Sequence, residues 1–391
     1  MMLTAEARRR GENKGSTSLL FLFVLILTLF SAPGVLAATP APDVRAAAWL
    51  LVDHGSGQVL AEHRADARVA PASLVKLMTA YLLFQKLQAG TLKLDDWVRI
   101  GPGAWAAKGA RIFLQPGTRA LAENLLKGMI VASANDAALA LAEHVAGSEE
   151  KFVAEMNATA RALGMDNTVF VNVTGLDQAG QRSSARDLGR LARALIRDFP
   201  DRYKLFALKE FTYAQSALYN RNALLWRDAA ADGVKTGQTR AAGFCLVASA
   251  QRGQMRLIAV VLGAKNEAAR TEAGERLMDY GFRNFETRLL YGAGAPAATR
   301  RVWMGDSGEL PLGLERDLYL TLPRGGHERL RARLTAPDTL HAPVGRGQRI
   351  GTLALELDRQ PYAEYPLVAL KEIKTGNILQ RALDHVRLWL Q

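Results

Sequence analysis

The sequence predicts an α/β fold built on an antiparallel sheet, followed by a small all-β module and a C-terminal amphipathic helix. Three observations support this prediction. In residues 38–290, strand-like apolar runs flank a long stretch with helical periodicity. Residues 298–372 hold short β-like runs between turn signals, and residues 375–391 repeat apolar side chains at helical spacing. A length of 391 residues suits two or three domains, at about 100 to 200 residues each.

The composition excludes several classes of protein. Hydrophobic residues make up 49% and charged residues 23%, which is typical of globular proteins and excludes wholesale disorder. The single cysteine, Cys245, rules out an internal disulfide and any site built from several cysteines. The six histidines are scattered and form no H-E-x-x-H pair, which excludes a zincin metalloprotease. We therefore expect neither a metal nor a cofactor.

The formal net charge of +12 could suit nucleic acid or an anionic surface. The sequence holds no nucleic-acid-binding motif, and its lysines and arginines are spread along the chain rather than clustered. We expect no nucleic-acid partner. Instead, we favour an anionic lipid or an anionic wall polymer as the partner of this basic protein.

Residues 1–37 have the pattern of a signal peptide. Basic residues, including Arg8 and Lys14, precede an apolar run from Leu19 to Phe30, and small residues follow a Pro-Gly pair. The run is shorter than the roughly 20 residues that a membrane span needs. An uncleaved N-terminal anchor is the alternative. We predict cleavage after Ala37 and an exported enzyme, which cannot depend on ATP.

The first domain begins with a predicted strand hairpin over residues 47–62, because apolar runs flank a His-Gly-Ser-Gly turn. Apolar spacing then predicts a helix over residues 73–88, opened by Pro71, and further helices over 121–129, 136–146 and 184–197. From Gly233 onward, the spacing of apolar residues becomes typical of strands. Two antiparallel strands are predicted at 243–250 and 255–263, followed by a helix at 267–280.

Residues 291–298 are rich in Gly, Ala and Pro and suggest a linker. The module beyond it, at 298–372, has the pattern of a small sandwich or barrel, with strands expected at 301–304, 318–322, 329–334, 348–357 and 365–370. The last segment places Ile378, Leu383, Val386 and Trp389 on one helical face, with polar residues opposite. This helix either docks on its own domain or, as we favour, lies in a membrane interface.

The first chemical motif is Ser73-Leu74-Val75-Lys76. Residues three apart share a helix face, so the Ser73 hydroxyl and the Lys76 amine should lie close together. Lysine can accept the hydroxyl proton if burial or a neighbouring cation lowers its pKa. The motif alone is weak, because Ser73 could be a helix cap and Lys76 a solvated side chain.

Two further motifs follow in the chain. Ser133-Ala134-Asn135 supplies a hydroxyl that could relay a proton and an amide that could orient the substrate. Lys235-Thr236-Gly237 offers a cation and a hydroxyl on a strand edge that could pair with an extended peptide and hold its carboxylate. Taken alone, the first of these two motifs could consist of ordinary loop residues, and the second could be a lysine on an edge strand. Together and in this order, the three are much more specific.

With these motifs the chain resembles the low-molecular-weight penicillin-binding proteins, the D-alanyl-D-alanine carboxypeptidases. The resemblance covers essentially the whole chain after the signal peptide, and further segments carry it. These are residues 71–74, 170–172, 175–177, 220–222, 224–226, 241–250, 281–286 and 341–343. It implies a serine β-lactamase/transpeptidase-like domain at 38–290, a small β-sandwich at 298–372 and a membrane-anchoring helix at 375–391.

The resemblance also implies residue roles. Ser73 would be the acyl-enzyme nucleophile, Lys76 its base and Ser133 a proton relay accompanied by Asn135. The substrate carboxylate would be bound by Lys235, Thr236 and Arg270, and the oxyanion by the backbone N–H groups of Ser73 and Gln238. Two positions depart from the family pattern: Ala134, where many members have Gly, and Gln238, where many have His. Gln238 still offers its backbone N–H to the oxyanion, so we expect acylation to be retained. The rate or the substrate preference could differ.

We therefore expect a serine D,D-carboxypeptidase that removes the terminal D-alanine from peptidoglycan stem peptides, binds β-lactams covalently, and lies at the periplasmic face of the inner membrane. A class A β-lactamase is disfavoured by the β module and terminal helix, and because no clear E-x-x-x-N segment lies between Ser133 and Lys235. A D,D-endopeptidase, which cleaves peptidoglycan crosslinks instead, is an alternative. A non-catalytic wall-binding protein is disfavoured because both Ser73 and Lys76 are present.

Overall fold

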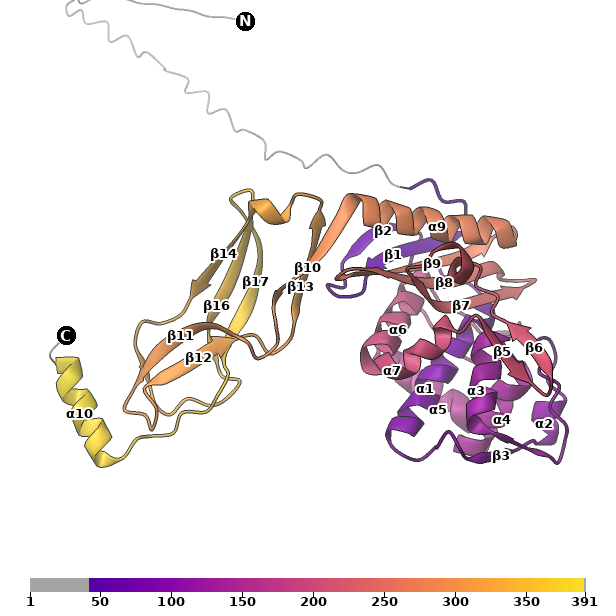
Figure 1. The fold of residues 1–391 in the computed structure, drawn as a ribbon, viewed down its shortest axis with the longest axis horizontal. Helices are drawn as coiled ribbons and strands as arrows, with labels where there is room; N and C mark the ends of the chain where they lie inside the picture. The colour runs from indigo at the N-terminus through magenta and orange to yellow at the C-terminus, as the bar shows by residue number, and fades with distance from the viewer. Residues whose placement is uncertain (1–41, 390–391) are drawn as a thin grey trace, which may run out of the picture. The chain divides into compact units, whose positions relative to one another are not determined.

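The computed structural model describes residues 42–389. The predicted signal peptide at 1–37 lies outside the described residues, as do Leu390 and Gln391. The fold confirms the predicted architecture: an antiparallel sheet with helices, a β domain and a C-terminal helix (Figure 1).

The first domain is organised around a five-stranded antiparallel sheet of order β2-β1-β9-β8-β7. The predicted hairpin over residues 47–62 is confirmed as the β1–β2 pair. Strand β7, which carries Lys235-Thr236-Gly237, lies at the edge of the sheet. The five strands are β1 Ala48–Asp53, β2 Val59–His63, β7 Ala231–Thr239, β8 Gly243–Arg252 and β9 Met255–Ala264.

Helices cover both faces of this sheet (Figure 1). Helix α9, Glu267–Asn284, packs on one face, and α6, Ala185–Asp198, packs on the other. A glycine permits close approach on each side: a Cβ at Gly281 would lie 2.5 Å from Leu257, and one at Gly189 would lie 2.7 Å from Leu50. Both faces are therefore buried, which explains the nearly continuous apolar runs of β1, β8 and β9.

The region between β2 and β7 is mostly helical. Helix α1 runs from Lys76 to Gln88, is buried over its first nine residues, and begins directly after a 3₁₀ turn, Ala72–Val75. The other helices are α2 Pro102–Trp105, α3 Ala122–Val131, α4 Asn135–Ala146, α5 Glu149–Ala162, α7 Pro200–Tyr203 and α8 Leu224–Arg227. Two small hairpins accompany them: β3 Trp97–Arg99 with β4 Arg119–Leu121, and β5 Glu210–Tyr213 with β6 Ser216–Tyr219.

Helix α5 was not predicted, although its signals are present in the sequence. The Ser148 side chain caps the helix by accepting a hydrogen bond from the Lys151 amide, and two glutamates occupy the first turn. Phe152, Met156 and Ala160 are buried at intervals of four residues. The polar composition of the other faces masked this narrow apolar stripe.

The β domain contains a two-stranded and a six-stranded sheet around a leucine-rich core. All five predicted runs correspond to strands, while β10, β12 and β15 were not predicted. Secondary structure occupies both ends of the segment expected to be a linker, since β10 continues to Tyr291 and β11 starts at Pro296. The strands are β10 Phe285–Tyr291, β11 Pro296–Trp303, β12 Glu309–Gly313, β13 Leu318–Pro323, β14 Leu330–Thr335, β15 Leu340–His341, β16 Arg349–Leu357 and β17 Gln360–Ala369.

The C-terminal helix α10 spans Ile378–Trp389 and begins with a capping box. The amide of Gln380 donates to the Asn377 side chain, and the amide of Asn377 donates to the Gln380 side chain, at 2.9 Å each. None of the described side chains of α10 is buried. Within residues 42–389, no helix combines the length and apolar composition that crossing a bilayer requires.

Candidate active site

Ser73 lies in the 3₁₀ turn that precedes α1, held between β7 and the loop after α5. Two glycines make this packing possible. A Cβ at Gly237 would lie 3.0 Å from the Ser73 amide nitrogen, and one at Gly175, which has a φ of +87°, would overlap the Ala72 carbonyl. The backbone around Ser73 is therefore fixed on both sides by neighbours that lack a side chain.

Lys76 is the first residue of α1 and is only 1% exposed. Its Nζ donates to Ser73 Oγ at 3.3 Å, to Asn135 Oδ1 at 2.6 Å and to the Thr174 carbonyl at 2.6 Å. Burial, followed by the charges of Lys235 and Arg221, holds the pKa of Lys76 well below its usual value. The site therefore favours a neutral amine, whose two hydrogens suffice for Asn135 and the Thr174 carbonyl, so that its lone pair can accept from the Ser73 hydroxyl.

Ser133 and Asn135 lie at the junction of α3 and α4 and are both 3% exposed. Ser133 has a φ of +61°, a strained value for a residue with a side chain. Besides binding Lys76, Asn135 donates from Nδ2 to the Lys108 carbonyl and from its backbone amide to the Ala110 carbonyl at 2.7 Å. Asn135 thus links the lysine to the loop that forms one wall of the site.

Asp136 supports the same wall and was not singled out from the sequence. Its buried carboxylate accepts hydrogen bonds from the amides of Ile112 and Leu114 at 3.1 to 3.2 Å. These bonds fix the loop that contains Gly109 and Ala110. The only sequence signal was an acidic residue in the first turn of a predicted helix, which the helix dipole also explains.

Lys235 and Thr236 lie on the edge strand β7 and are nearly fully buried. Lys235 Nζ donates to the Thr236 carbonyl at 3.1 Å. Burial, together with the charges of Arg221 and Arg270, lowers the pKa of Lys235 to about 7. A carboxylate arriving beside Lys235 would favour its charged form, because an opposite charge raises the pKa of a lysine.

Arg270 and Arg221 add two cations. Arg270, on α9, is 4% exposed and donates to Glu267 Oε1 at 2.6 Å and to the Arg221 carbonyl at 3.4 Å. Arg221 belongs to one of the segments that carry the family resemblance, yet no motif in the sequence assigns it a role. Its charge lowers the pKa of both Lys76 and Lys235, so it is part of the electrostatics of the site.

Six of the eight predicted site residues border one cavity of about 360 Å³. Of the predicted site residues, Lys76 and Lys235 lie behind its wall, where Lys76 contacts Ser73 and Asn135, and Lys235 contacts the Thr236 backbone. The other six, Ser73, Ser133, Asn135, Thr236, Gln238 and Arg270, line it with Gly109, Ala110, Gly175, Leu176, Arg221, Gly237, Thr239 and Glu267.

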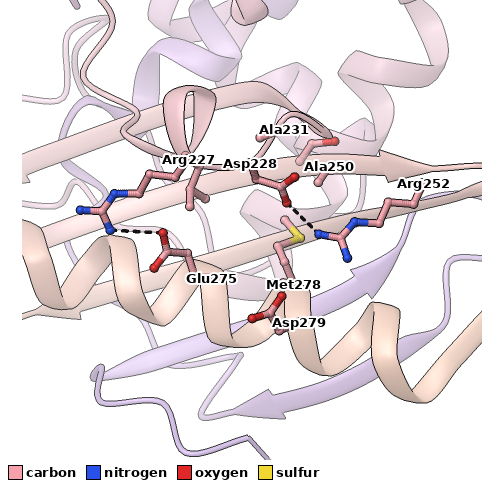
Figure 2. A pocket seen from close by; sticks show the side chains of 10 residues that line it. Arg227, Asp228, Ala231, Ala250, Arg252, Glu275, Met278 and Asp279 are labelled. Atoms are coloured by element: carbon pink, nitrogen blue, oxygen red, sulfur yellow. Dashed lines mark hydrogen bonds and ion pairs between the residues drawn. The ribbon is translucent and has the colours of Figure 1, made fainter.

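A different cavity, of about 300 Å³, lies between α8, the ends of β7 and β8, and α9. Figure 2 shows two ion pairs beside it, Arg227 with Glu275 at 3.2 Å and Arg252 with Asp228 at 3.0 Å. It contains none of the predicted site residues. Both of its arginines are paired with carboxylates, and none of the three chemical motifs reaches this cavity.

Within residues 42–389, no group of three or more His, Cys, Asp or Glu side chains is arranged to hold a metal ion. Cys245 is buried, and burial raises the pKa of its thiol to about 11, so it is a poor ligand and nucleophile at neutral pH.

Comparison with known proteins assigns the chain to a family. Residues 35–266 match the D-alanyl-D-alanine carboxypeptidase family, and residues 285–375 match the C-terminal domain of penicillin-binding protein 5. The D-alanyl-D-alanine carboxypeptidase DacC of Escherichia coli is 43% identical over 97% of this chain and 95% of its own length.

Two solved structures agree with this assignment. Penicillin-binding protein 5 from Haemophilus influenzae superposes with a TM-score of 0.80 at 37% identity, covering 86% of this chain and 99% of that one. Penicillin-binding protein D2 from Listeria monocytogenes, in its ampicillin-bound form, gives a TM-score of 0.58 at 32% identity over 62% of this chain and all of its own. The chain is therefore a member of the D-alanyl-D-alanine carboxypeptidase family of penicillin-binding proteins.

Proposed function

We propose that this enzyme removes the terminal D-alanine from peptidoglycan stem pentapeptides through an acyl-enzyme on Ser73. The observation that carries the proposal is the contact between a buried, pKa-depressed Lys76 amine and the Ser73 hydroxyl. A neutral amine can take the hydroxyl proton as the serine oxygen attacks the peptide carbonyl. The carbonyl oxygen would then be stabilised by the backbone N–H groups of Ser73 and Gln238, both of which border the cavity.

The bound peptide would be oriented by its free C-terminus. Thr236, Arg270 and Arg221 line the cavity, and Lys235 lies directly behind Thr236. A terminal carboxylate placed there would bring the scissile bond to Ser73. Ser133, which lines the same cavity with Asn135, is suited to pass a proton to the departing D-alanine amine. Water would then hydrolyse the acyl-enzyme and release the shortened stem.

Reaction with β-lactams follows from the same geometry. A β-lactam presents a strained amide beside a carboxylate, so it would fit between Ser73 and the cations as the substrate does. The ampicillin-bound structure of the Listeria relative supports this proposal. We infer a role in peptidoglycan biosynthesis and in control of cell shape.

We further propose that the enzyme is exported and associates peripherally with the periplasmic face of the inner membrane through α10. Asp384, on the polar side of this helix, accepts a hydrogen bond from the Met304 amide at 2.7 Å. The apolar side remains exposed: Leu379 is 72% and Trp389 86% accessible. An exposed apolar helix face with Trp and Arg suits a membrane interface better than docking on its own domain.

The function is tested by mass spectrometry of muropeptides. Isolated pentapeptide-containing peptidoglycan is incubated with the full chain or with Ser73→Ala and then digested. We expect pentapeptides to lose one alanine with the wild-type enzyme only. Conversion of crosslinked dimers to monomers, with pentapeptides intact, would instead identify an endopeptidase.

A further inference from the structure

A short loop segment, residues 173–175, touches the surroundings of both Lys76 and Ser73. The Thr174 carbonyl accepts a hydrogen bond from Lys76 Nζ at 2.6 Å. Gly175 lies against the turn that carries the serine, where an added Cβ would come within 2.8 Å of the Ser73 amide nitrogen. A displacement of this segment would therefore move an acceptor of the lysine and the backbone beside the serine together.

The Thr174 carbonyl determines which side of the Lys76 amine faces the serine. A neutral amine has two hydrogens and one lone pair. The hydrogens are directed at the Thr174 carbonyl and at Asn135 Oδ1, at 2.6 Å each, which leaves the lone pair for Ser73 Oγ at 3.3 Å. If the carbonyl moved away, the amine could rotate about its last bond and direct a hydrogen at the serine instead.

The buried side chain of Asn172 fixes the direction of this carbonyl. Its Oδ1 accepts from the Gly175 amide at 2.8 Å and from the Thr174 amide at 3.2 Å, and its Nδ2 donates to the Leu176 carbonyl at 3.1 Å. The Gly175 N–H and the Thr174 carbonyl belong to one planar peptide group. The bond from that N–H to Asn172 therefore also sets the direction in which the carbonyl points.

Helix α1 holds the same segment from the other side. Thr79, one turn after Lys76, is fully buried, and its Oγ1 donates to the Val173 carbonyl at 2.9 Å. Residues three apart share a helix face. Lys76 and Thr79 thus bind two successive carbonyls of the loop, so that the loop is aligned with the helix that carries the lysine.

We propose that Asn172, together with Thr79, is a positioning residue for the general base. The two side chains hold the Thr174 carbonyl against Lys76 and so keep the lone pair of the amine directed at Ser73. Asn172 is not among the residues that line the catalytic cavity, so it acts on the reaction through the lysine. The proposal rests on the proposed function, because it assumes that Lys76 takes the serine proton.

The test measures acylation of the full chain by a chromogenic β-lactam in a stopped-flow instrument. The dependence on β-lactam concentration separates the dissociation constant of the noncovalent complex from the rate constant of acylation, k2. Asn172→Leu keeps the approximate size of the side chain and removes its hydrogen bonds. We expect k2 to fall about 10- to 100-fold, with little change in the dissociation constant. Mass spectrometry should show that the variant is still acylated completely at long times.

A matched control distinguishes positioning from simple stabilisation of the loop. Asn157, on α5, binds the same loop at Phe170, donating to its carbonyl at 2.8 Å and accepting from its amide at 2.9 Å. Asn157→Leu therefore removes comparable bonds to the loop backbone without touching residues 173–175. It should lower the free energy of unfolding but keep k2 close to the wild-type value. Equal losses of k2 in Asn157→Leu and Asn172→Leu would overturn the proposal.

Thr79 provides a second pair of variants, which decides the question if Asn172→Leu does not fold. Thr79→Val replaces the hydroxyl by a methyl group and should lower k2, whereas Thr79→Ser keeps the hydroxyl and should retain k2. An unchanged k2 in Thr79→Val, or an equal loss in Thr79→Ser, would overturn the proposal and leave the proposed function standing. Failure of the wild type to be acylated would instead refute the proposed function itself.

Discussion

The Nζ of Lys76 lies 3.3 Å from the Oγ of Ser73, one helical turn away. The lysine is enclosed by protein, and nearby cations further disfavour its charged form. In the proposed mechanism this pair activates the serine without histidine, because a buried neutral amine can replace the imidazole as the proton acceptor.

Replacing Lys76 should abolish acylation. Lys76→Ala removes the proton acceptor, and general-base catalysis is worth about 10² to 10⁴ in rate. Lys76→Arg should be equally inactive, since a guanidinium stays protonated. Stopped-flow acylation by a chromogenic β-lactam measures the loss. The wild-type rate should also fall as pH decreases, because protonation of Lys76 removes the base; an unchanged rate in Lys76→Arg would exclude the lysine from this role.

Lys235 should discriminate between acids and esters. Lys235→Ala should weaken turnover of a peptide with a free terminal carboxylate by about 2 to 5 kcal/mol, but affect its methyl ester much less. The pKa of Lys235 is lowered to about 7, so the free enzyme loses this positive charge as pH rises through that value. The KM for the acid should therefore increase above about pH 7, and that for the ester should not. Equal losses for acid and ester would show that Lys235 does not bind the carboxylate.

Asp136 should stabilise the loop that walls the site. Asp136→Ala leaves the buried amides of Ile112 and Leu114 without their acceptor, at a cost of about 1 to 3 kcal/mol for each unsatisfied group. Urea denaturation should show this decrease in the free energy of unfolding. Asp95→Ala, at an exposed position, serves as the control and should change stability little. Equal stability of the two variants would contradict the support that we attribute to Asp136.

Helix α10 should bind membranes through its apolar face. Leu383→Glu places a charge on that face and should weaken co-sedimentation with anionic liposomes several-fold, since each buried leucine contributes on the order of 1 kcal/mol. His385→Glu adds the same charge at a polar position and should have a smaller effect. Hydrolysis of small peptides should be unchanged in both variants, because the proposed catalytic residues precede the β domain. Equal binding by both variants and the wild type would place membrane contact elsewhere.

The sequence was sufficient to predict the features with strong local signals. The periodic helices α1, α3, α4, α6 and α9 and the strands of the sheet follow from apolar spacing. The three motifs identified six residues that the fold brings to one cavity or directly behind it: Ser73, Lys76, Ser133, Asn135, Lys235 and Thr236.

Features that depend on distant contacts could not be predicted in this way. The role of Asp136 depends on amides 22 and 24 residues earlier in the chain, and Arg221 acts on lysines that only the tertiary structure brings near it. The β5–β6 hairpin is short and its turn residues, Ala214 and Gln215, have positive φ values without glycine. No local turn signal marks it, so its presence reflects packing against α3.

The most direct test of the central claim is the site of covalent attachment by a β-lactam. The full chain and Ser73→Ala are incubated with ampicillin, and peptide mapping by mass spectrometry locates the adduct. Circular dichroism checks that the variant remains folded. We expect a single acylated residue, Ser73, in the wild type and no adduct in the folded variant. An adduct on another residue, or labelling that persists in Ser73→Ala, would contradict it.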